Sequence, residues 1–358
     1  MRGGTEGQCA RTVQALAGRG WPQRVGVFAR EGFFLQAVEQ VCGPVHELRI
    51  RRLVSPRTTA EVGRLVRLIR TLRVALVHAW DADAAIFGGL AAAVSGAPLL
   101  TSRRDLGEIY SPRKLRLMRW ADRRACAVVV NAGAIAASPA CRHLEAGRVH
   151  VIPNILDRAE FDARARSPQA PVPELESGRW IAMVARLDPE KDVATLLRAI
   201  PRVRTACPDA RFLIVGDGRE RASLETLAAQ LGIIPAVRFL GEFHEIPALL
   251  ARCFAGVLVP NRNEGLSNTI MEYMAAGLPS VATDCGGNRE LVEDGRTGFV
   301  VRAGDADAVA ERLLVLLNEP ARAKAMGNTG RSVIEQRHQP GVIASQFEEL
   351  YRSIVAVV

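Results

Sequence analysis

Short apolar runs alternate with helix-like segments along both halves of this 358-residue chain, and this alternation restricts the fold more than any other feature. Parallel strands that are buried on both faces read as such runs, and the helices between them cover the sheet. The length exceeds that of one hydrophobic core. Prolines between Pro153 and Gly178 interrupt any regular element and mark a linker. The sequence therefore predicts two α/β domains; the strand-like runs of the first are 24–29, 74–78, 98–101, 127–130 and 149–152.

The segment 261–290 carries the clearest functional signal. A helix is predicted from Thr269 to Ala276, with Gly277 and Pro279 ending it. The unpaired N–H groups and positive dipole end of its first turn attract a phosphate. A capped surface helix with two solvated glutamates fits the same residues equally well. The residues singled out are Glu264, the polar loop Gly265, Leu266, Ser267 and Asn268, of which Ser267 or Asn268 can cap the helix, and Glu272.

The spacing of Glu264 and Glu272 argues against one kind of site. Eight residues separate them, roughly 12 Å if the stretch were helical. The two carboxyl groups of a glycosidase lie only about 5 to 9.5 Å apart. The two glutamates therefore suit the ends of an extended ligand with phosphates between them, which is the shape of a sugar nucleotide.

Two cations lie upstream in one strand-to-helix loop. A strand is predicted from Trp180 to Val184, followed by Arg186 and by a helix that begins near Lys191. Two cations in one loop can neutralise a diphosphate. Only three of the 47 basic residues are lysine, so Lys191 is notable in a chain that otherwise uses arginine. A later strand ends in Gly216-Asp217-Gly218, where glycines let a ligand approach the backbone.

Together these residues resemble the donor-binding domain of retaining glycosyltransferases of family 4, also called glycosyl transferases group 1. The resemblance covers nearly all of residues 178–320 and, more weakly, the N-terminal half. It implies the GT-B fold, with two Rossmann-like domains facing each other across a cleft. The expected domains are residues 1–165 for the acceptor, 166–340 for the nucleotide sugar, and a helix at 341–358 that packs back on the first. The matching motifs are Arg186 and Lys191, Gly216-Asp217-Gly218, Phe239-Leu240-Gly241, Glu264 with Glu272, and Gly286-Gly287 before Glu290.

The resemblance also implies roles for these residues. Arg186 and Lys191 would contact the donor diphosphate, and Glu264 the transferred hexose. Glu272 would hold the ribose hydroxyls. The backbone of Ser267, Asn268 and Thr269 would bind the phosphates, and Leu240 would lie beside the base. Arg186, Lys191 and Glu264 are the predicted catalytic residues, and the nucleotide sugar is a substrate, so no cofactor is expected.

The N-terminal half departs from the family pattern. Family members begin with a strand that leads into a Gly-Gly loop, and here Gly3 and Gly4 come almost at the first residue. We therefore expect the first strand of that sheet to be missing, with a start codon assigned too late as the favoured reason. Gly3 and Gly4 would approach the donor phosphates or the acceptor. Where some relatives have a histidine, this chain has Thr101-Ser102-Arg103-Arg104-Asp105, and the usual Asn-Gly is Asn154-Ile155. His78 fits the cleft, but a structural role is favoured.

Several classes of site and location are disfavoured. Asp81-Ala82-Asp83 imitates a metal-binding Asp-x-Asp but lacks the expected partners, so no metal is predicted. Seven scattered cysteines form no metal or redox pair and suit a reducing cytosol. The uncharged segment 84–102 is broken by glycines and Pro98, which predicts a buried helix, a turn and a strand rather than a membrane span. The polar first residues do not form a signal peptide. We expect a cytoplasmic protein.

Positive charge is concentrated in the N-terminal half. Residues 1–166 contain 26 Lys and Arg against 14 Asp and Glu, a net charge of +12, whereas the remainder has a net charge of −3. The segment 112–124, PRKLRLMRWADRR, predicts a basic amphipathic helix. Such a helix can lie on an anionic membrane, and an ordinary surface helix fits it equally well. Nucleic acid fits poorly because no recognised motif accompanies the charge. Peripheral contact with the inner face of the cytoplasmic membrane is the hypothesis.

The predicted function is transfer of a hexose, with retention of configuration and without a metal, from a UDP or GDP sugar. The acceptor would be an anionic lipid-linked or polysaccharide molecule in cell-envelope or exopolysaccharide synthesis. A catalytically silent, glycosyltransferase-like binding subunit at the membrane is the alternative. A sugar-nucleotide epimerase has no support, because no acid and base pair is apparent.

Overall fold

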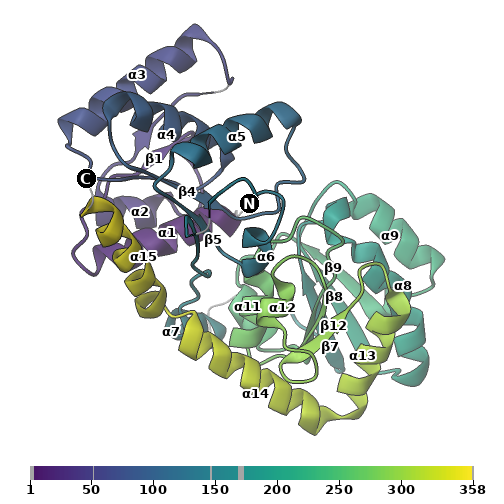
Figure 1. Cartoon of the computed structure of the whole chain (residues 1–358). Helices are drawn as coiled ribbons and strands as arrows, with labels where there is room; N and C mark the ends of the chain where they lie inside the picture. The colour runs from purple at the N-terminus through teal and green to yellow at the C-terminus, as the bar shows by residue number, and fades with distance from the viewer. Residues whose placement is uncertain (1–3, 51, 146, 168–172, 357–358) are drawn as a thin grey trace. The chain divides into compact units, whose positions relative to one another are not determined.

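The computed structural model describes residues 4–50, 52–145, 147–167 and 173–356. The chain divides into two compact units, each built from parallel β-sheet with helices around it (Figure 1). Unit 1 comprises Met1–Ile155 and Pro340–Val358, and unit 2 comprises Leu156–Gln339. Of the candidate residues, Gly3 lies outside the described part of the chain.

The strands of unit 1 form two parallel sheets. A small one pairs β1 with β2, and a larger one has the order β3-β4-β5-β6. The strands are β1 Gly26–Val27, β2 His46–Glu47, β3 Val77–Ala79, β4 Leu99–Arg103, β5 Ala127–Val130 and β6 Val149–Val151. The helices are α1 Gly4–Ala17, α2 Leu35–Cys42, α3 Pro56–Thr71, α4 Ala82–Ser95, α5 Pro112–Arg124, α6 Gly133–Ala136 and α15 Pro340–Val355.

The division of this sheet is consistent with the expected absence of a first strand. The first described element is the helix α1, which begins at Gly4. Within the described residues, β2 is the one strand that pairs with β1, and β4 is the one strand that pairs with β3. In the described part of the chain, one side of β1 and one side of β3 therefore have no hydrogen-bonded neighbouring strand.

Core packing in unit 1 follows from small and apolar residues. Strands β4 and β5 are buried throughout. Ile343 and Phe347 of α15 join Leu16 and Leu100 in one buried cluster, so the last helix contributes to the core of unit 1. Helix α4 ends at Gly96, which is left-handed (φ +81°), and β4 follows. The helix, turn and strand predicted for residues 84–102 are confirmed.

Unit 2 contains one six-stranded parallel sheet with the order β12-β11-β10-β7-β8-β9. The strands are β7 Arg179–Val184, β8 Ala210–Val215, β9 Val237–Gly241, β10 Ala255–Leu258, β11 Ser280–Thr283 and β12 Gly298–Val301. The helices are α7 Arg158–Ala165, α8 Val193–Ala206, α9 Arg221–Gln230, α10 Ile246–Leu250, α11 Asn268–Ala275, α12 Asn288–Leu291, α13 Ala306–Asn318 and α14 Pro320–Arg337, with 3-10 turns η1 Pro189–Lys191 and η2 Ile234–Ala236.

Helix α7 belongs to unit 2, although the expected boundary at residue 165 put it in the first domain. Three contacts hold it there. Asp162 accepts from Arg331 Nη2 at 2.6 Å, Arg158 pairs with Glu335 at 2.6 Å, and Arg164 pairs with Glu245 at 3.2 Å. The observed division thus falls directly after Ile155 and before Pro340.

Candidate functional site

The loop after β7 carries both predicted phosphate-binding cations. Arg186 pairs with Asp188 at 2.6 Å and with Glu190 at 3.3 Å, and its side chain is 53% exposed. The 3-10 turn η1 then places Lys191 at its end, and Asp192 is left-handed (φ 47°) before α8 begins. The predicted strand and the helix start near Lys191 are therefore confirmed, but Arg186 turns toward two carboxylates of its own loop.

A second loop, between β10 and α11, carries Glu264. Asn261 ties this loop to the first, since its N–H donates to Glu190 O (3.0 Å) and its Nδ2 donates to Pro189 O (3.1 Å). Thr283 Oγ1 donates to Pro260 O at 2.6 Å from the neighbouring strand β11. The two loops are thereby fixed to each other at the carboxyl ends of β7 and β10, the edge of a parallel sheet where ligands bind.

Lys191 and Glu264 meet between these loops as an ion pair from Nζ to Oε2. Their side chains are 19% and 11% exposed. A pair that is mostly withdrawn from water is screened little by salt, and removal of one partner leaves the other charge uncompensated. The structure therefore holds a cation and a carboxylate, 73 positions apart in the chain, at one point of the edge.

Two close backbone approaches explain the glycines around this pair. Gly286 is left-handed (φ +55°), and a Cβ there would lie 1.8 Å from Glu264 O. Gly216 (φ +132°) would place a Cβ 1.9 Å from Ala185 O, beside the Arg186 loop. Only glycine fits either position. Gly218 is similarly close to Leu187, and the Asp217 carboxylate accepts from Gly218 N–H and pairs with Arg221.

Helix α11 begins where the sequence predicts. Ser267 is its N-cap, with Oγ accepting from Ile270 N–H at 3.3 Å. Gly265, Leu266 and Ser267 are buried, whereas Asn268, Thr269 and Glu272 are partly exposed. The eight-residue helix ends before Gly277 (φ +73°) and Pro279. The capped helix start is confirmed, and its partly exposed first turn follows directly from the Glu264 loop.

Sequence reasoning missed Tyr273, which fixes α11 on the sheet. Its side chain is fully buried; Oη accepts from Val184 N–H (2.8 Å) and donates to Val257 O (3.1 Å). The ring occupies the space that a Cβ at Gly256 would need, 2.2 Å from ring carbon Cδ2. The glycine inside strand β10 was the available signal, because such a residue marks a close approach. Tyr273 therefore fixes the distance between α11 and the strands β7 and β10.

The remaining donor-side candidate, Leu240, is partly buried and packs against the core cluster around Trp180 and Leu213. Gly241 follows it with φ +72°, and its carbonyl accepts from Gly216 N–H at 2.8 Å. The end of β9 is thus bonded to the turn after β8. This backbone contact links the Phe239-Leu240-Gly241 motif to the Gly216-Asp217-Gly218 motif.

In unit 1, Asp81 and Asp83 have structural contacts. Asp81 caps α4, where its Oδ1 accepts from Ala84 N–H at 2.7 Å, and burial raises the pKa of its carboxyl. Asp83 pairs with Lys114 at 2.9 Å. No group of three or more His, Cys, Asp or Glu among the described residues has the arrangement of a metal site.

His78 is built into the core of unit 1. Its Nδ1 contacts Tyr351 Oη at 2.6 Å and its Nε2 contacts Ser102 Oγ at 2.8 Å. Burial, with a smaller effect of Arg104, lowers the pKa of the imidazole to about 3. A ring that is neutral and occupied on both nitrogens fits the structural role favoured from the sequence.

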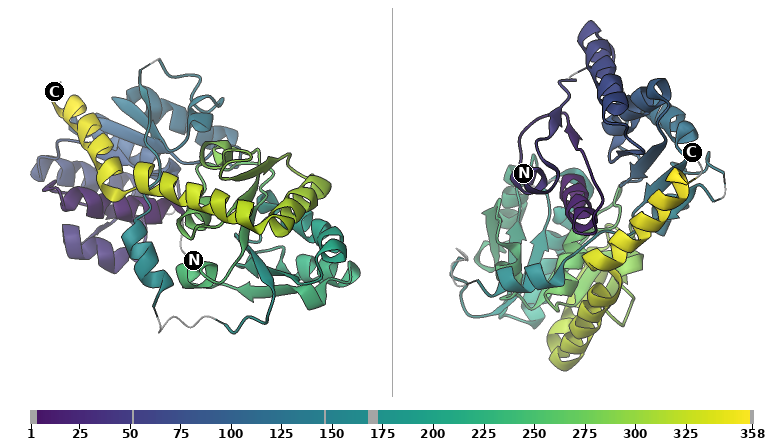
Figure 2. Two further views of the ribbon diagram at one scale, coloured as in Figure 1. Left: turned by 90° about the horizontal axis from the view of Figure 1, so that it is seen from below. Right: turned by 90° about the vertical axis from the view of Figure 1, so that its left-hand side faces the viewer.

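Helices α3, α4 and α5 lie side by side in unit 1 (Figure 2). The predicted helix 112–124 is α5, and Met118 on its apolar side is buried while its cations are outside. We call the exposed surface of these three helices the basic surface; it carries Arg64, Arg67, Leu90, Val94, Arg113, Arg116, Leu117, Arg119, Arg123 and Arg124. Across the described residues, no helix combines the length and apolar character needed to cross a bilayer.

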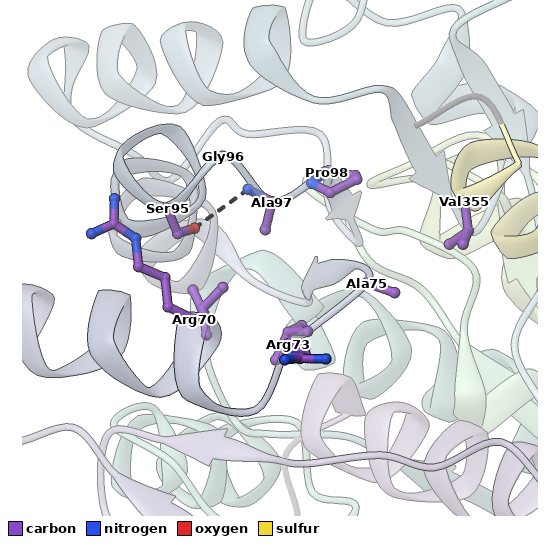
Figure 3. Close-up of a pocket in the computed structure, with 10 residues that line it drawn as sticks. Arg70, Arg73, Ala75, Ser95, Gly96, Ala97, Pro98 and Val355 are labelled. Carbon is purple, nitrogen blue, oxygen red and sulfur yellow. Dashed lines mark hydrogen bonds between the residues drawn. The ribbon is translucent and has the colours of Figure 1, made fainter.

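A hollow of about 380 Å³ opens in unit 1 at the amino ends of β3 and β4, next to the segments that lead into these strands (Figure 3). Arg70, Arg73 and Val355 line it, and Ala97 N–H donates to Ser95 Oγ at 3.4 Å within it. Arg70 Nη2 is already bonded to Val94 O. Residues 74–75 and 97–98 precede β3 and β4, so the hollow lies at the amino ends of these strands, whereas parallel sheets bind ligands at their carboxyl ends.

Comparison with known proteins identifies the family of the chain. The family model described as Glycosyltransferase Family 4 matches residues 2–160, and the one described as Glycosyl transferases group 1 matches residues 178–319. Among related proteins, a GDP-mannose-dependent monoacylated alpha-(1-6)-phosphatidylinositol monomannoside mannosyltransferase of Corynebacterium glutamicum is 35% identical over 184 residues, which cover 48% of this chain and 47% of the relative. The N-acetyl-alpha-D-glucosaminyl L-malate synthase of Bacillus anthracis is 29% identical over 180 residues, covering 50% and 47%. The chain spans about half the length of the curated relatives it matches.

Solved structures match nearly the whole chain. HepE of Anabaena, crystallised with UDP, has a TM-score of 0.83 at 24% identity and covers 98% of this chain and 96% of its own. Sucrose-phosphate synthase of Thermosynechococcus elongatus has a TM-score of 0.79 at 21% identity, covering 99% and 94%. The predicted α/β, GT-B architecture is confirmed. This chain belongs to glycosyltransferase family 4 of the glycosyl transferases group 1.

Proposed function

We propose that this chain is a retaining hexosyltransferase that uses a UDP or GDP sugar and a lipid-linked or polysaccharide acceptor in cell-envelope or exopolysaccharide synthesis. The carrying observation is the Lys191–Glu264 pair, held by two tied loops beside the start of α11. The names of relatives support a nucleotide sugar, since one is called GDP-mannose-dependent and HepE was crystallised with UDP.

The roles of the unit 2 residues follow from their chemistry. Lys191 and Arg186 would neutralise the diphosphate, together with the N–H groups of residues 267–269 at the start of α11. Glu264 would hold the hexose while it positions Lys191. Glu272, one turn along the partly exposed side of α11, would bind the ribose hydroxyls, and the end of β9 at Leu240 would lie beside the base.

The same groups supply the catalytic effect in this proposal. Negative charge grows on the departing nucleoside diphosphate as the bond to the sugar breaks. Preorganised donors that face that charge stabilise the transition state, and here they are Lys191 and backbone N–H groups rather than a divalent cation. The acceptor hydroxyl would attack from the face that the diphosphate leaves, and the leaving phosphate would take its proton. Configuration at the anomeric carbon is then retained.

The basic surface supports peripheral contact with an anionic membrane. Seven exposed arginines of α3 and α5 lie on it, with Leu90, Val94 and Leu117 between or beside them. The apolar side of α5 packs inward at Met118, so this contact would rest on charge and on these three apolar residues rather than on insertion of a free helix face.

Transfer from a panel of sugar nucleotides tests the proposed activity. The protein is incubated with UDP and GDP sugars, with a membrane extract or oligosaccharide mixture as acceptor, and release of nucleoside diphosphate and the anomeric configuration of the product are measured. Turnover of one donor with retention supports the proposal. Tight binding of a nucleotide without release or transfer from any donor would favour the silent binding subunit.

Flotation with liposomes tests the membrane contact. We expect wild-type protein to float with vesicles that contain phosphatidylglycerol and not with neutral phosphatidylcholine vesicles. The variant Arg116→Glu/Arg119→Glu should lose flotation. Arg252→Glu/Arg337→Glu, which reverses the same number of exposed charges in unit 2, should keep it. Equal flotation with both lipids, or no effect of the α5 variant, contradicts the contact.

A further inference from the structure

Two consecutive arginines lie at the end of strand β4: Arg103 is its last residue and Arg104 follows it. In the described part of the chain, only Arg103 pairs with a carboxylate. Arg103 is buried and donates from Nε to Asp122 Oδ2 at 3.1 Å, as part of an ion pair between two buried side chains. Thr101 Oγ1 donates to the other oxygen of Asp122 at 2.8 Å. Arg103 therefore has the carboxylate that a buried guanidinium needs.

Arg104 has no such partner. No described residue forms an ion pair with it. Its Nη1 donates to Asn154 Oδ1 at 2.8 Å, its guanidinium carbon lies 4.5 Å from the ring centre of Trp80, and its buried Nε has no hydrogen bond. Burial lowers the pKa of Arg104 to about 10, so it remains a cation at neutral pH. The Cys9 thiol beside it is neutral, because burial raises its pKa to about 12.

A second polar group near Arg104 is also unsatisfied. Asn131 is 3% exposed; its Nδ2 donates to Asn154 Oδ1 at 3.1 Å, while its own Oδ1 is buried without a partner. Asn154 Oδ1 thus joins Arg104 and Asn131. Native proteins satisfy most buried polar atoms, so two orphaned atoms in one connected group point to a ligand.

The group lies where a parallel sheet binds ligands. Trp80, Arg104 and Asn131 each directly follow a strand, β3, β4 and β5, and Asn154 lies just beyond β6. The carboxyl ends of these four strands share one edge. His78 packs against Trp80 with ring centres 4.6 Å apart, and the bonds of His78 to Tyr351 and Ser102 keep that tryptophan in place. We call Trp80, Arg104, Asn131 and Asn154 the Arg104 cluster.

The free atoms define the ligand chemistry. With Nη1 bonded to Asn154, the Nε and Nη2 side of Arg104 remains, and this side of a guanidinium takes a carboxylate or phosphate through two parallel bonds. The free Asn131 Oδ1 accepts a hydrogen bond and suits a hydroxyl. We propose that the Arg104 cluster binds an acidic group of the acceptor, a carboxylate or a phosphate with a hydroxyl beside it. That this acid belongs to the acceptor rests on the proposed function, whereas the binding of an acid to the cluster does not.

Binding of small probes to the full-length protein tests this assignment. Glucuronate and glycerol 1-phosphate represent the carboxylate and phosphate sources, and glucose and glycerol are their neutral counterparts. Titration calorimetry or saturation-transfer NMR should detect at least one acid and neither neutral probe. Arg104→Gln should weaken that binding at least tenfold, and Arg104→Lys, which keeps the charge but not the two parallel donors, should fall between. Arg57→Gln removes an exposed charge of the same unit and should bind as wild type.

Two further readouts separate the possible failures. Arg104→Gln should keep or raise the melting temperature, because it removes a buried charge without a counter-ion, whereas a structural role for Arg104 requires a fall. Its affinity for UDP and GDP should stay unchanged, so failure of the donor proposal is seen independently. Equal binding of acids and neutral probes, or equal binding by wild type and Arg104→Gln, overturns the assignment.

Discussion

The cations at the carboxyl ends of the strands have different partners in the unit 2 sheet and in the four-stranded sheet of unit 1. In unit 2, Arg186 pairs with Asp188 and Glu190 of its own loop, and Lys191 pairs with Glu264 of the loop after β10, so a carboxylate compensates each cation. In unit 1, Arg104 has an amide and an aromatic ring as neighbours, and no carboxylate of the described residues pairs with it. In the proposed function, unit 2 would therefore attract phosphate through backbone N–H groups as well as through side chains. Unit 1 offers an uncompensated charge. The presence of cations alone therefore does not locate an anion site, because pairing with carboxylates decides which cation is available to a ligand.

The largest effect is expected at Gly286, which sets the position of Glu264. Gly286→Ala puts a Cβ 1.8 Å from Glu264 O at a positive φ. We expect a loss of about 2–4 kcal/mol in unfolding free energy and at least about 10² in turnover. Gly295→Ala is the matched control, because its φ is +75° with nothing within 4 Å. Urea denaturation and donor turnover measure both. If the two variants behave alike, close packing does not position Glu264.

Lys191→Ala should lower turnover about 10²-fold, because it removes the less exposed cation of the edge. Arg186→Ala should cost about tenfold or less, since its side chain is 53% exposed and shared between two carboxylates. Lys324→Ala removes an exposed lysine of α14 and should leave the rate unchanged. Steady-state kinetics with the identified donor measures all three. A rate for Lys191→Ala within twofold of wild type would refute its electrostatic role.

Tyr273→Phe should have a smaller effect that falls on stability. The substitution leaves the partly buried Val184 N–H without its acceptor, at a cost of about 1–2 kcal/mol, and we expect turnover to change less than about tenfold. Tyr351→Phe, which removes a hydroxyl bonded to His78 in unit 1, should also destabilise but leave nucleotide affinity unchanged. Chemical denaturation and nucleotide titration separate these outcomes. If Tyr351→Phe changed nucleotide affinity, nucleotide binding would not be confined to the unit 2 site.

The smallest effect concerns pH and unit 1. The pKa of His78 in the folded chain is about 3, below its ordinary value of 6.5. Between these values the unfolded chain takes up a proton that the folded chain does not, so stability falls as pH decreases. The slope is at most about 1.4 kcal/mol per pH unit for this group. Urea unfolding at pH 7 and pH 5 should show the loss, and His78→Gln should reduce the slope. An unchanged slope would mean that other groups dominate.

The sequence predicted unit 2 well because its signals are local. Strand β7, the cap at Ser267 and the end of α11 at Gly277 depend on neighbouring residues, and each was found. The ion pairs of Arg186 and Lys191 were not predicted from the sequence, because loop geometry brings Asp188, Glu190 and Glu264 to these cations. Tyr273 was also missed, because its two hydrogen bonds join strands far apart in the chain.

In unit 1 the runs predicted from the sequence correspond to β1, β3, β4, β5 and β6, but neither β2 nor the difference between Arg103 and Arg104 was predicted. Both lie in one dipeptide, and their partners come from α5 in one case and from the end of β6 in the other. The apolar face of segment 112–124 was likewise undecided until Met118 was seen to be buried. Long-range packing, which no spacing encodes, decides these points.

The proposal that Lys191 in unit 2, and not Arg104 in unit 1, binds the nucleoside diphosphate is tested by titration calorimetry with UDP and GDP. Wild type, Lys191→Ala and Arg104→Gln are compared in one buffer. We expect that one of the two nucleotides binds wild type, that Lys191→Ala weakens this binding at least tenfold, and that Arg104→Gln binds within twofold of wild type. Binding of neither nucleotide to wild type, or equal affinity for wild type and Lys191→Ala, would contradict this proposal.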